Sequence, residues 1–200
     1  GGKTIFVTST LSGEGKTFVS INLAAVLSLT DKKVLLIGAD IRKPKIGEYL
    51  ELRYEKGLTH FLMDNAIKPA DIIESVKEVN FDFISSSLIP PNPSELLMRE
   101  RMNELFEILK ERYDYIVVDT APVGLVTDTL LIAPQADLVL YVVRAKMLDA
   151  RMLSIPQTLY QQKKLNNMAV LINGTELGGK GYGYGYGYGY GYGYGDAAKK

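Results

Sequence analysis

Short apolar runs alternate along the chain with longer segments whose hydrophobic residues recur every three or four positions. The apolar runs predict strands at residues 4–8, 33–37, 81–85, 115–119, 137–143 and 168–172. The longer segments predict helices at residues 17–28, 93–112, 126–133 and 148–164. Residues 34–37 and 116–118 are continuously apolar, which is typical of strands that a parallel sheet buries on both faces. The pattern therefore predicts an α/β fold, a mainly parallel doubly wound sheet flanked by helices.

The pattern is less regular between residues 46 and 79. There it predicts only two short helices, near residues 57–63 and 69–76. In the segment 93–112, by contrast, Pro93 stands early, where helices accept proline, and an apolar stripe follows it. We therefore expect one long helix over residues 93–112.

The C-terminal segment differs from the rest of the chain. From residue 181 to residue 195, glycine and tyrosine alternate strictly. Tyrosine at every second position could suggest a strand, but glycine opposes one, because it loses the most backbone entropy and has no side chain to pack. We predict a compact domain at residues 1–177 and a flexible, disordered tail at residues 178–200.

Composition excludes several classes of function. The 200 residues hold 23 Lys plus Arg and 23 Asp plus Glu, and this balance argues against a nucleic-acid partner. Cysteine is absent and His60 is the single histidine, so thiolate and histidine-cluster metal sites are excluded. No apolar run approaches the roughly 20 residues that span a bilayer. We also expect no signal peptide.

A glycine-rich motif follows the first apolar run and precedes a helical segment. It reads Thr-Leu-Ser-Gly-Glu-Gly-Lys-Thr over residues 10–17, close to the P-loop pattern, with Thr10 in place of the first glycine. Such a loop aims successive N–H groups at phosphates, and a helix N-terminus adds its dipole. The motif predicts an ATP and Mg²⁺ site in a P-loop NTPase, with Lys16 reaching the β- and γ-phosphates and Thr17 holding Mg²⁺. The residues expected to bind the nucleotide are Ser12, Gly13, Glu14, Gly15, Lys16 and Thr17.

Two aspartates follow predicted strands, at the edge where α/β sheets bind ligands. Asp119 ends one strand and can hold Mg²⁺, although an aspartate there could instead cap a helix or a turn. Asp40 follows another strand and could instead make a local turn. The candidate catalytic residues are Lys16, Asp40 and Asp119, and the candidate metal ligands are Thr17, Asp40 and Asp119.

These motifs together resemble the bacterial tyrosine kinases, the cytoplasmic domains of capsule and exopolysaccharide co-polymerases. The resemblance covers nearly the whole chain and rests on residues 8–17, 39–44, 91–97, 119–122 and 127–128, and on the tyrosine-rich C-terminus. It implies an ATP-dependent protein-tyrosine kinase domain that forms ring-like homo-oligomers, in which one subunit phosphorylates the tail of its neighbour. The acceptors would be Tyr182, Tyr184, Tyr186, Tyr188, Tyr190, Tyr192 and Tyr194.

The resemblance also sets an expectation about location and partners. It implies a place at the cytoplasmic face of the bacterial inner membrane, with a membrane-anchored activator segment upstream in the same chain or in a partner. One position departs from the family pattern: Gly38 stands where the family carries an aspartate that is thought to help with metal binding and acceptor activation. Asp40 is then the remaining candidate for the base that accepts the tyrosine proton.

Two further residues are candidates for contact with the nucleotide. Arg42 could contact phosphate or a neighbouring subunit, or could belong to a solvated basic turn. Asn173 follows the last predicted strand and could read the amino edge of adenine, or form a simple turn with Gly174.

Two other functions remain open on the sequence. The chain could be a partition-type ATPase switch that hydrolyses ATP to control its dimerisation. It could also be an ATP-binding assembly module whose catalysis is weakened by Gly38. The tyrosine tail and residues 91–97 favour the kinase.

Overall fold

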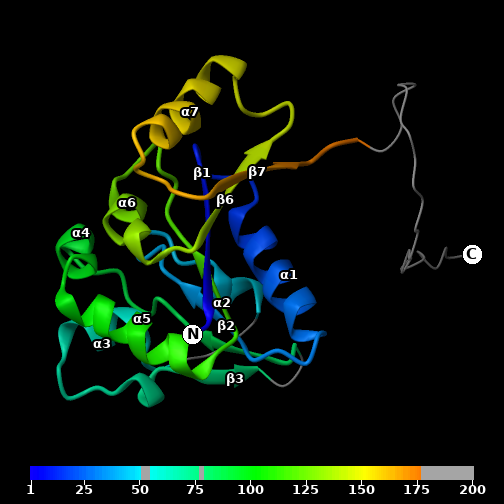
Figure 1. Cartoon of the computed structure of the whole chain (residues 1–200). Helices are drawn as coiled ribbons and strands as arrows, with labels where there is room; N and C mark the ends of the chain where they lie inside the picture. Colours follow the sequence, from blue (N-terminus) through cyan, green and yellow to red (C-terminus); the bar gives the residue numbers. More distant parts are fainter. Residues whose placement is uncertain (51–54, 77–78, 177–200) are drawn as a thin grey trace, which may run out of the picture.

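The computed structural model describes residues 1–50, 55–76 and 79–176. In this part of the chain, seven strands form one sheet in the order β3-β4-β2-β5-β1-β6-β7 (Figure 1). The strands are β1 Lys3–Ser9, β2 Val34–Gly38, β3 Glu74–Val76, β4 Phe81–Ile84, β5 Tyr115–Asp119, β6 Leu138–Arg144 and β7 Met168–Asn173. All neighbouring pairs are parallel except the pair formed by β3 and β4. The mainly parallel α/β sheet that the sequence predicts is confirmed.

Helices cover both faces of this sheet (Figure 1). They are α1 Lys16–Ser28, α2 Ile46–Tyr49, α3 Leu58–Met63, α4 Pro93–Leu97, α5 Glu100–Arg112, α6 Asp128–Ile132 and α7 Ser154–Gln161, with 3₁₀ turns at Pro69–Asp71, Ala133–Gln135 and Ala150–Leu153. One hydrophobic cluster includes residues of α1 and α2, and the other includes residues of α3 to α7. The sheet is therefore the middle layer of three.

Strand β2 shows why the central runs are continuously apolar. Leu35 and Ile37 belong to the cluster on the α5 face, whereas Val34 and Leu36 belong to the cluster on the α1 face. Successive side chains of a strand point to opposite faces of the sheet. In a strand that is covered on both sides, every side chain therefore faces a hydrophobic layer. The uninterrupted run in the sequence is the consequence.

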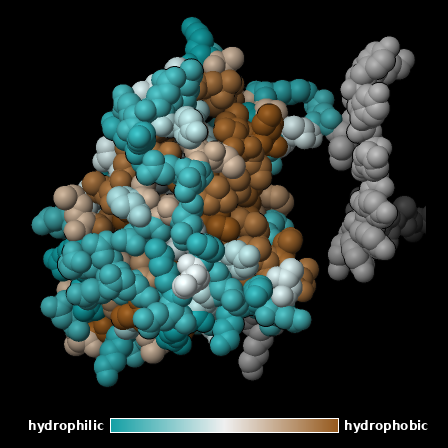
Figure 2. All heavy atoms as spheres, viewed as in Figure 1, coloured by the Kyte–Doolittle hydropathy of each residue, from teal (hydrophilic) through white to brown (hydrophobic). Residues whose placement is uncertain are grey.

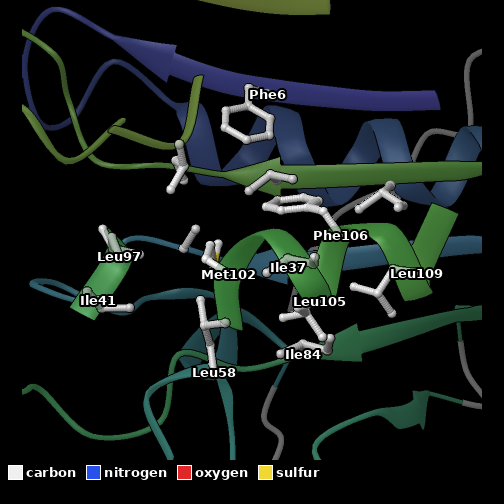
Figure 3. Packing of buried hydrophobic residues seen from close by; sticks show 14 of the residues in the cluster. Phe6, Ile37, Ile41, Leu58, Ile84, Leu97, Met102, Leu105, Phe106 and Leu109 are labelled. Atoms are coloured by element: carbon white, nitrogen blue, oxygen red, sulfur yellow. The ribbon is translucent and has the colours of Figure 1, made fainter. Parts of the chain in front are cut away.

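Helix α5 is the main covering element of the larger cluster (Figure 3). Its buried side chains Met102, Leu105, Phe106 and Leu109 recur at helical spacing and face the sheet. Phe106 lies against Phe6 of β1, with ring centroids 5.9 Å apart. Ring pairs at this separation add to the stabilisation that burial of their area supplies.

The structure corrects the predicted long helix at residues 93–112. The helix is broken between α4 and α5, where Arg99 has an extended backbone conformation. The Arg99 guanidinium donates to the carbonyl oxygen of Leu62, and the Arg101 guanidinium donates to that of Phe61. Both carbonyls belong to the last turn of α3, which has no intrahelical donors to offer them. The break therefore lets two arginines cap α3.

The predicted helix at residues 69–76 is wrong in its second half. The segment forms only the 3₁₀ turn Pro69–Asp71, and residues 74–76 form β3 on the free edge of β4. Ser75 donates from its hydroxyl to the Asp82 carboxylate on β4, which favours this pairing. The predicted helices at residues 126–133 and 148–164 are also shorter than expected, as α6 and α7 with their adjoining 3₁₀ turns.

Helix α1 packs on the sheet through small and polar side chains. Its buried residues Lys16, Ser20, Ala24 and Ser28 recur every fourth position, so the helix backbone approaches the sheet closely. Large apolar residues are left on its outer side. Figure 2 shows hydrophobic atoms gathered on the side of the molecule where α1 and β7 lie, and the exposed large hydrophobic residues of these elements are Phe18, Val26, Val170 and Ile172.

Candidate active site

The carboxyl ends of β1, β2 and β5 meet at one edge of the sheet. Asp119, the last residue of β5, is in register with Val7 of β1 on one side and with Gly38 of β2 on the other. The backbone N–H groups of Ala39 and Asp40 both donate to the carbonyl oxygen of Asp119. The chain segments that follow these three strands are therefore drawn together around Asp119.

The glycine-rich loop between β1 and α1 has the conformation that its sequence predicts. Gly13 and Gly15 have φ angles of 89° and 95°, in the left-handed region that favours glycine. A Cβ atom at Gly15 would also lie 2.1 Å from the Nδ2 atom of Asn173, so this position has no room for a side chain. Lys16 then begins α1 directly after this turn. The loop thus presents backbone N–H groups and a helix N-terminus to one side, as phosphate binding requires.

Glu14 supports this loop from within. Its side chain is fully buried, and its carboxylate accepts hydrogen bonds from the N–H groups of Leu11, at 2.6 Å, and Arg144, at 3.3 Å. The Arg144 guanidinium in turn donates to the carbonyl oxygen of Gly13. The expectation that Glu14 contacts the nucleotide is therefore corrected for its side chain, which is turned into the loop and braces it against β6.

Asp119 is the most unusual titratable group of the site. Its side chain is 3 % exposed, and it accepts hydrogen bonds from the hydroxyl groups of Thr17, at 2.8 Å, and Ser20, at 3.2 Å. Burial raises the pKa of Asp119 from 3.8 to about 6, although the charge of Lys16 and the hydroxyl donors act to lower it. Asp119 and Thr17 are thus adjacent, the arrangement in which both oxygens can face one metal ion.

A cleft of about 400 Å³ opens beside the glycine-rich loop. The residues that line it are Ser12, Gly13, Gly15, Lys16, Thr17, Phe18, Asp40, Lys43, Lys45, Tyr49, Arg144, Asn173 and Gly174. Among the predicted site residues, Ser12, both glycines, Lys16, Thr17, Asp40 and Asn173 therefore meet in one place. The cleft is rich in cations, which suits an anionic ligand.

Asn173 and Asp40 lie at opposite ends of this cleft and are held differently. Asn173 ends β7 and donates through Nδ2 to the carbonyl oxygen of Glu14, so it also braces the loop. Asp40 follows β2, and its carboxylate accepts from the backbone N–H of Lys43 at 3.0 Å, which is the local turn foreseen as the alternative. This bond uses one carboxylate oxygen and leaves the other for a ligand.

Arg42 is not among the described residues that line the cleft. Its guanidinium donates twice to the buried carboxylate of Asp128, at 2.6 and 3.0 Å, and once to the hydroxyl of Ser94. Ser94 also donates to Asp128, so one carboxylate joins the segment after β2, the start of α4 and the start of α6. Burial acts to raise the pKa of Asp128, but the bonds from Arg42 and Ser94 hold it below its usual value. The guanidinium of Arg42 is therefore held by an ion pair outside the lining of the cleft, and its contact with the nucleotide stays a prediction.

Comparisons with known proteins agree with this geometry. The family model described as an AAA domain matches residues 2–170. The tyrosine-protein kinase etk of Escherichia coli strain K12 is 35 % identical over 172 residues, 85 % of this chain and 23 % of the relative. The solved kinase domain of Escherichia coli tyrosine kinase ETK superposes with a TM-score of 0.83 at 33 % identity, covering 92 % of this chain and 72 % of that domain. The chain belongs to the bacterial tyrosine kinase family. Tyrosine-protein kinase wzc of Salmonella typhi is a second such relative, 35 % identical over 178 residues, 89 % of this chain and 25 % of the relative.

The chain thus spans about a quarter of the length of these curated members of the bacterial tyrosine kinase family. Within its described residues, no helix is long and apolar enough to cross a membrane. The predicted acceptor tyrosines, Tyr182 to Tyr194, and the predicted domain boundary at residue 177 lie outside the described residues.

Ser20 and the cleft residues Phe18, Lys45 and Tyr49 had no role predicted from the sequence. Ser20 follows Lys16 by one helical turn, so its position on the buried face could have been read from the spacing. Arg144 directly follows the predicted strand at residues 137–143, which made it a candidate for contact with phosphate or a neighbouring subunit, and it ends β6 beside the glycine-rich loop. Asp128 was expected to order the loop after the strand that ends at Asp119, but its partners Arg42 and Ser94, 86 and 34 residues away in the sequence, could not be identified from its own segment.

Proposed function

We propose that this chain is an ATP-dependent protein-tyrosine kinase domain that phosphorylates a C-terminal tyrosine cluster in trans within a homo-oligomer. The observation that carries the proposal is the cleft beside the glycine-rich loop. It joins Lys16 and Thr17 with Asp40, and its other end is lined by Asn173 and Gly174, the residues that lead into the Gly-Tyr segment. The phosphate site and the root of the tyrosine segment therefore lie at one edge of the sheet.

The residues present fit Mg-ATP. Bound Mg-ATP would supply the phosphoryl group, and phosphoryl transfer requires mainly positioning and charge neutralisation. Lys16 and the loop N–H groups would hold the phosphates. Within the described residues, no group of three or more acidic or histidine side chains could hold a metal alone. A Mg²⁺ ion held by Thr17 and Asp119 would therefore complete its coordination with phosphate oxygens and water, which is its usual preference.

Asp40 is the carboxylate placed to accept the proton of the acceptor tyrosine. It lines the cleft, and one of its oxygens is free of the turn that it forms with Lys43. The ordinary pKa of tyrosine, about 10, is too high for the hydroxyl to ionise by itself near neutral pH. A carboxylate within hydrogen-bond reach of the hydroxyl removes this limitation as the new bond forms.

The tether between the cleft and the tail permits either route of transfer. Strand β7 runs parallel to β6, and β6 runs parallel to β1, so the chain leaves the sheet at the edge of the glycine-rich loop. If the tail is the flexible chain that the sequence predicts, the stretch of about 14 residues from Gly174 to Tyr188 would span roughly 20 Å on average. Geometry therefore allows transfer in cis, and the preference for trans rests on the family resemblance.

Incubation of the purified chain with Mg-ATP, followed by detection of phosphotyrosine and of released phosphate, tests the proposal. Label on the tail residues is the expected result. Phosphate release without tail label would assign the chain to the ATPase switches. Nucleotide binding without either product would assign it to the assembly modules.

A mixture of two proteins separates trans from cis transfer. One protein is Lys16→Ala with its tail, and the other is an active chain whose seven tail tyrosines are replaced by serine. Phosphotyrosine on the Lys16→Ala tail is the expected result. If the mixture stays unlabelled while the unaltered chain labels itself at a rate independent of its concentration, the transfer is in cis.

Membership in the bacterial tyrosine kinase family also supports a proposal about the location and the biological role of the kinase. We propose that it works at the cytoplasmic face of the bacterial inner membrane, with a membrane-anchored activator segment in the same chain or a partner, and that it regulates the synthesis and export of capsular or exopolysaccharide. Ultracentrifugation of the chain with and without such a segment would measure the oligomer that this setting requires.

A further inference from the structure

The end of the cleft near β2 carries side chains for which the nucleotide provides no obvious use. Lys43, Lys45 and Tyr49 line the cleft there, in the segment that follows β2 and in α2. The side chain of Tyr49 is 59 % exposed, and a second exposed aromatic residue, Phe18 at 57 %, also lines the cleft. Among the described residues, neither Lys43 nor Lys45 forms an ion pair.

The strand order places the two ends of the cleft far apart along the edge of the sheet. Strands β2 and β7 are four positions apart in the sheet, about 19 Å, with the glycine-rich loop between them after β1. Asp40, the candidate base, belongs to the β2 end. An acceptor hydroxyl must lie within hydrogen-bond reach of the base, so the acceptor peptide enters from this end.

We propose that Phe18, Tyr49, Lys43 and Lys45 form an acceptor-docking rim that binds the tyrosines two residues before or after the reacting tyrosine of a Gly-Tyr segment from a second copy. This inference rests on the proposed kinase function and adds a binding site for the substrate. In an extended chain, residues two apart point to the same side and are about 7 Å from each other. When one tyrosine of the repeat reaches Asp40, its neighbours therefore face the same surface of the cleft.

The chemistry of the rim matches this occupant. The Gly-Tyr repeat between residues 181 and 195 has no charged residue, so unmodified it offers only aromatic rings and backbone. Exposed rings such as Tyr49 and Phe18 pair with such rings. After a first transfer, a neighbouring phosphotyrosine carries a charge of about −1.5 to −2, which the ammonium groups of Lys43 and Lys45 attract. The rim would therefore bind a partly phosphorylated tail more tightly than a fresh one.

Three fluorescent peptides test the rim by binding, in the absence of ATP. All have the form Gly-X-Gly-Tyr-Gly-X-Gly, with serine, phenylalanine or phosphotyrosine at both X positions. The protein is the full chain with its seven tail tyrosines replaced by serine, so that its own tail does not compete. We expect the phenylalanine peptide to bind about three- to tenfold more tightly than the serine peptide. We expect the phosphotyrosine peptide to bind about tenfold more tightly than the phenylalanine peptide.

Matched variants assign these differences to the rim. Tyr49→Ala should abolish the preference for phenylalanine over serine, whereas Tyr49→Phe should keep it. Tyr160→Ala is the control, since Tyr160 is 58 % exposed but lies on α7, away from the cleft. The double variant Lys43→Gln and Lys45→Gln should abolish the preference for phosphotyrosine. Its control is the double variant Lys68→Gln and Lys164→Gln, which changes two exposed lysines that do not line the cleft.

Several results would overturn the acceptor-docking rim. One is equal binding of all three peptides by the unaltered protein. Another is a Tyr49→Phe variant that loses as much of the preference for the phenylalanine peptide as Tyr49→Ala does. A lower ATP affinity in the lysine variant, with peptide binding unchanged, would assign Lys43 and Lys45 to the nucleotide instead. Failure of the kinase function is a separate result, because it appears as absence of phosphotyrosine with Mg-ATP while peptide binding is unaffected.

Discussion

Asp119 should make the nucleotide-free protein less stable than it would be with a neutral residue at the same place. The side chain is 3 % exposed and ends a central strand, and its charge is only partly satisfied by the hydroxyl groups of Thr17 and Ser20. Asp119→Asn keeps the shape and can still form hydrogen bonds with both hydroxyl groups. We therefore expect Asp119→Asn to be more stable to urea than the unaltered chain at pH 7.5.

The magnitude follows from the pKa of Asp119. The pKa is raised from 3.8 to about 6 by burial, a difference of about two units, which corresponds to about 3 kcal/mol. Between these two values the folded state holds a proton that the unfolded state has released, so the free energy of unfolding falls as the pH rises. The full loss of unfolding free energy that the Asp119 charge causes is present above pH 6, and about half of this loss is removed at pH 5. Loss of the attraction between Lys16 and the carboxylate makes about 3 kcal/mol an upper value.

Urea unfolding of both proteins at a series of pH values between 5 and 8 measures this effect. The difference in the free energy of unfolding between Asp119→Asn and the unaltered chain isolates the one carboxyl group, because all other groups titrate in both proteins. Greater stability of the unaltered chain at pH 7.5 would show that the Asp119 charge does not destabilise the fold. A stability difference that stays constant between pH 8 and pH 5 would show that this carboxyl group has no raised pKa.

Three further substitutions test other parts of the site. Lys16→Ala should abolish tail phosphotyrosine while its circular dichroism spectrum stays unchanged, and an undiminished rate of labelling would remove Lys16 from the mechanism. Asp128→Ala should lower the free energy of unfolding by about 2–3 kcal/mol, because it leaves the Arg42 guanidinium without its buried partner. Glu176→Ala, which breaks an exposed pair with Lys146, is the matched control and should leave stability unchanged. Glu14→Ala should weaken ATP binding about tenfold in a calorimetric titration, since the N–H of Leu11 loses its acceptor, and unchanged affinity would show that the loop needs no brace.

Local patterns in the sequence were sufficient for the central sheet and the phosphate loop. The apolar runs around residues 34–37 and 116–118 report burial on both faces, which only a covered parallel sheet provides. The two glycines of the loop indicate a backbone with positive φ. The lysine and threonine that follow them indicate that the loop binds phosphate. In both cases the physical cause acts between residues that are close in the sequence.

The errors arose where a distant partner decides the local structure. The break between α4 and α5 places Arg99 and Arg101 beside their acceptors on α3, which lie 37 and 40 residues earlier in the sequence. Strand β3 exists because β4 has a free edge, which no pattern within residues 69–76 reveals. For Arg42 the sequence left open contact with phosphate, contact with a neighbouring subunit and a solvated turn, and the buried acceptor on α6 could not be identified from its own segment.

The fold does not require a glycine at position 38. A glycine is often retained because no other residue fits, but a Cβ atom at position 38 would meet its nearest neighbours at 3.4 to 3.7 Å, in ordinary van der Waals contact. The φ angle at this position is not positive, so the backbone does not require glycine either. A carboxylate placed there would lie beside Asp119, its partner in the sheet register, and close to Asp40.

We therefore expect the missing carboxylate at position 38 to limit the reaction and not the fold. We expect Gly38→Asp to raise the rate of tail phosphorylation about tenfold, a modest effect for an added acid–base group because Asp40 is the base in the proposed mechanism. Gly38→Asn is the matched control, with the same size and no charge, and should leave the rate near that of the unaltered chain. Equal rates in a folded Gly38→Asp protein would mean that Asp40 alone supplies the base. A rate raised equally by asparagine would mean that the side chain acts by filling the space beside Ser86 and Ile46, and that its charge is irrelevant.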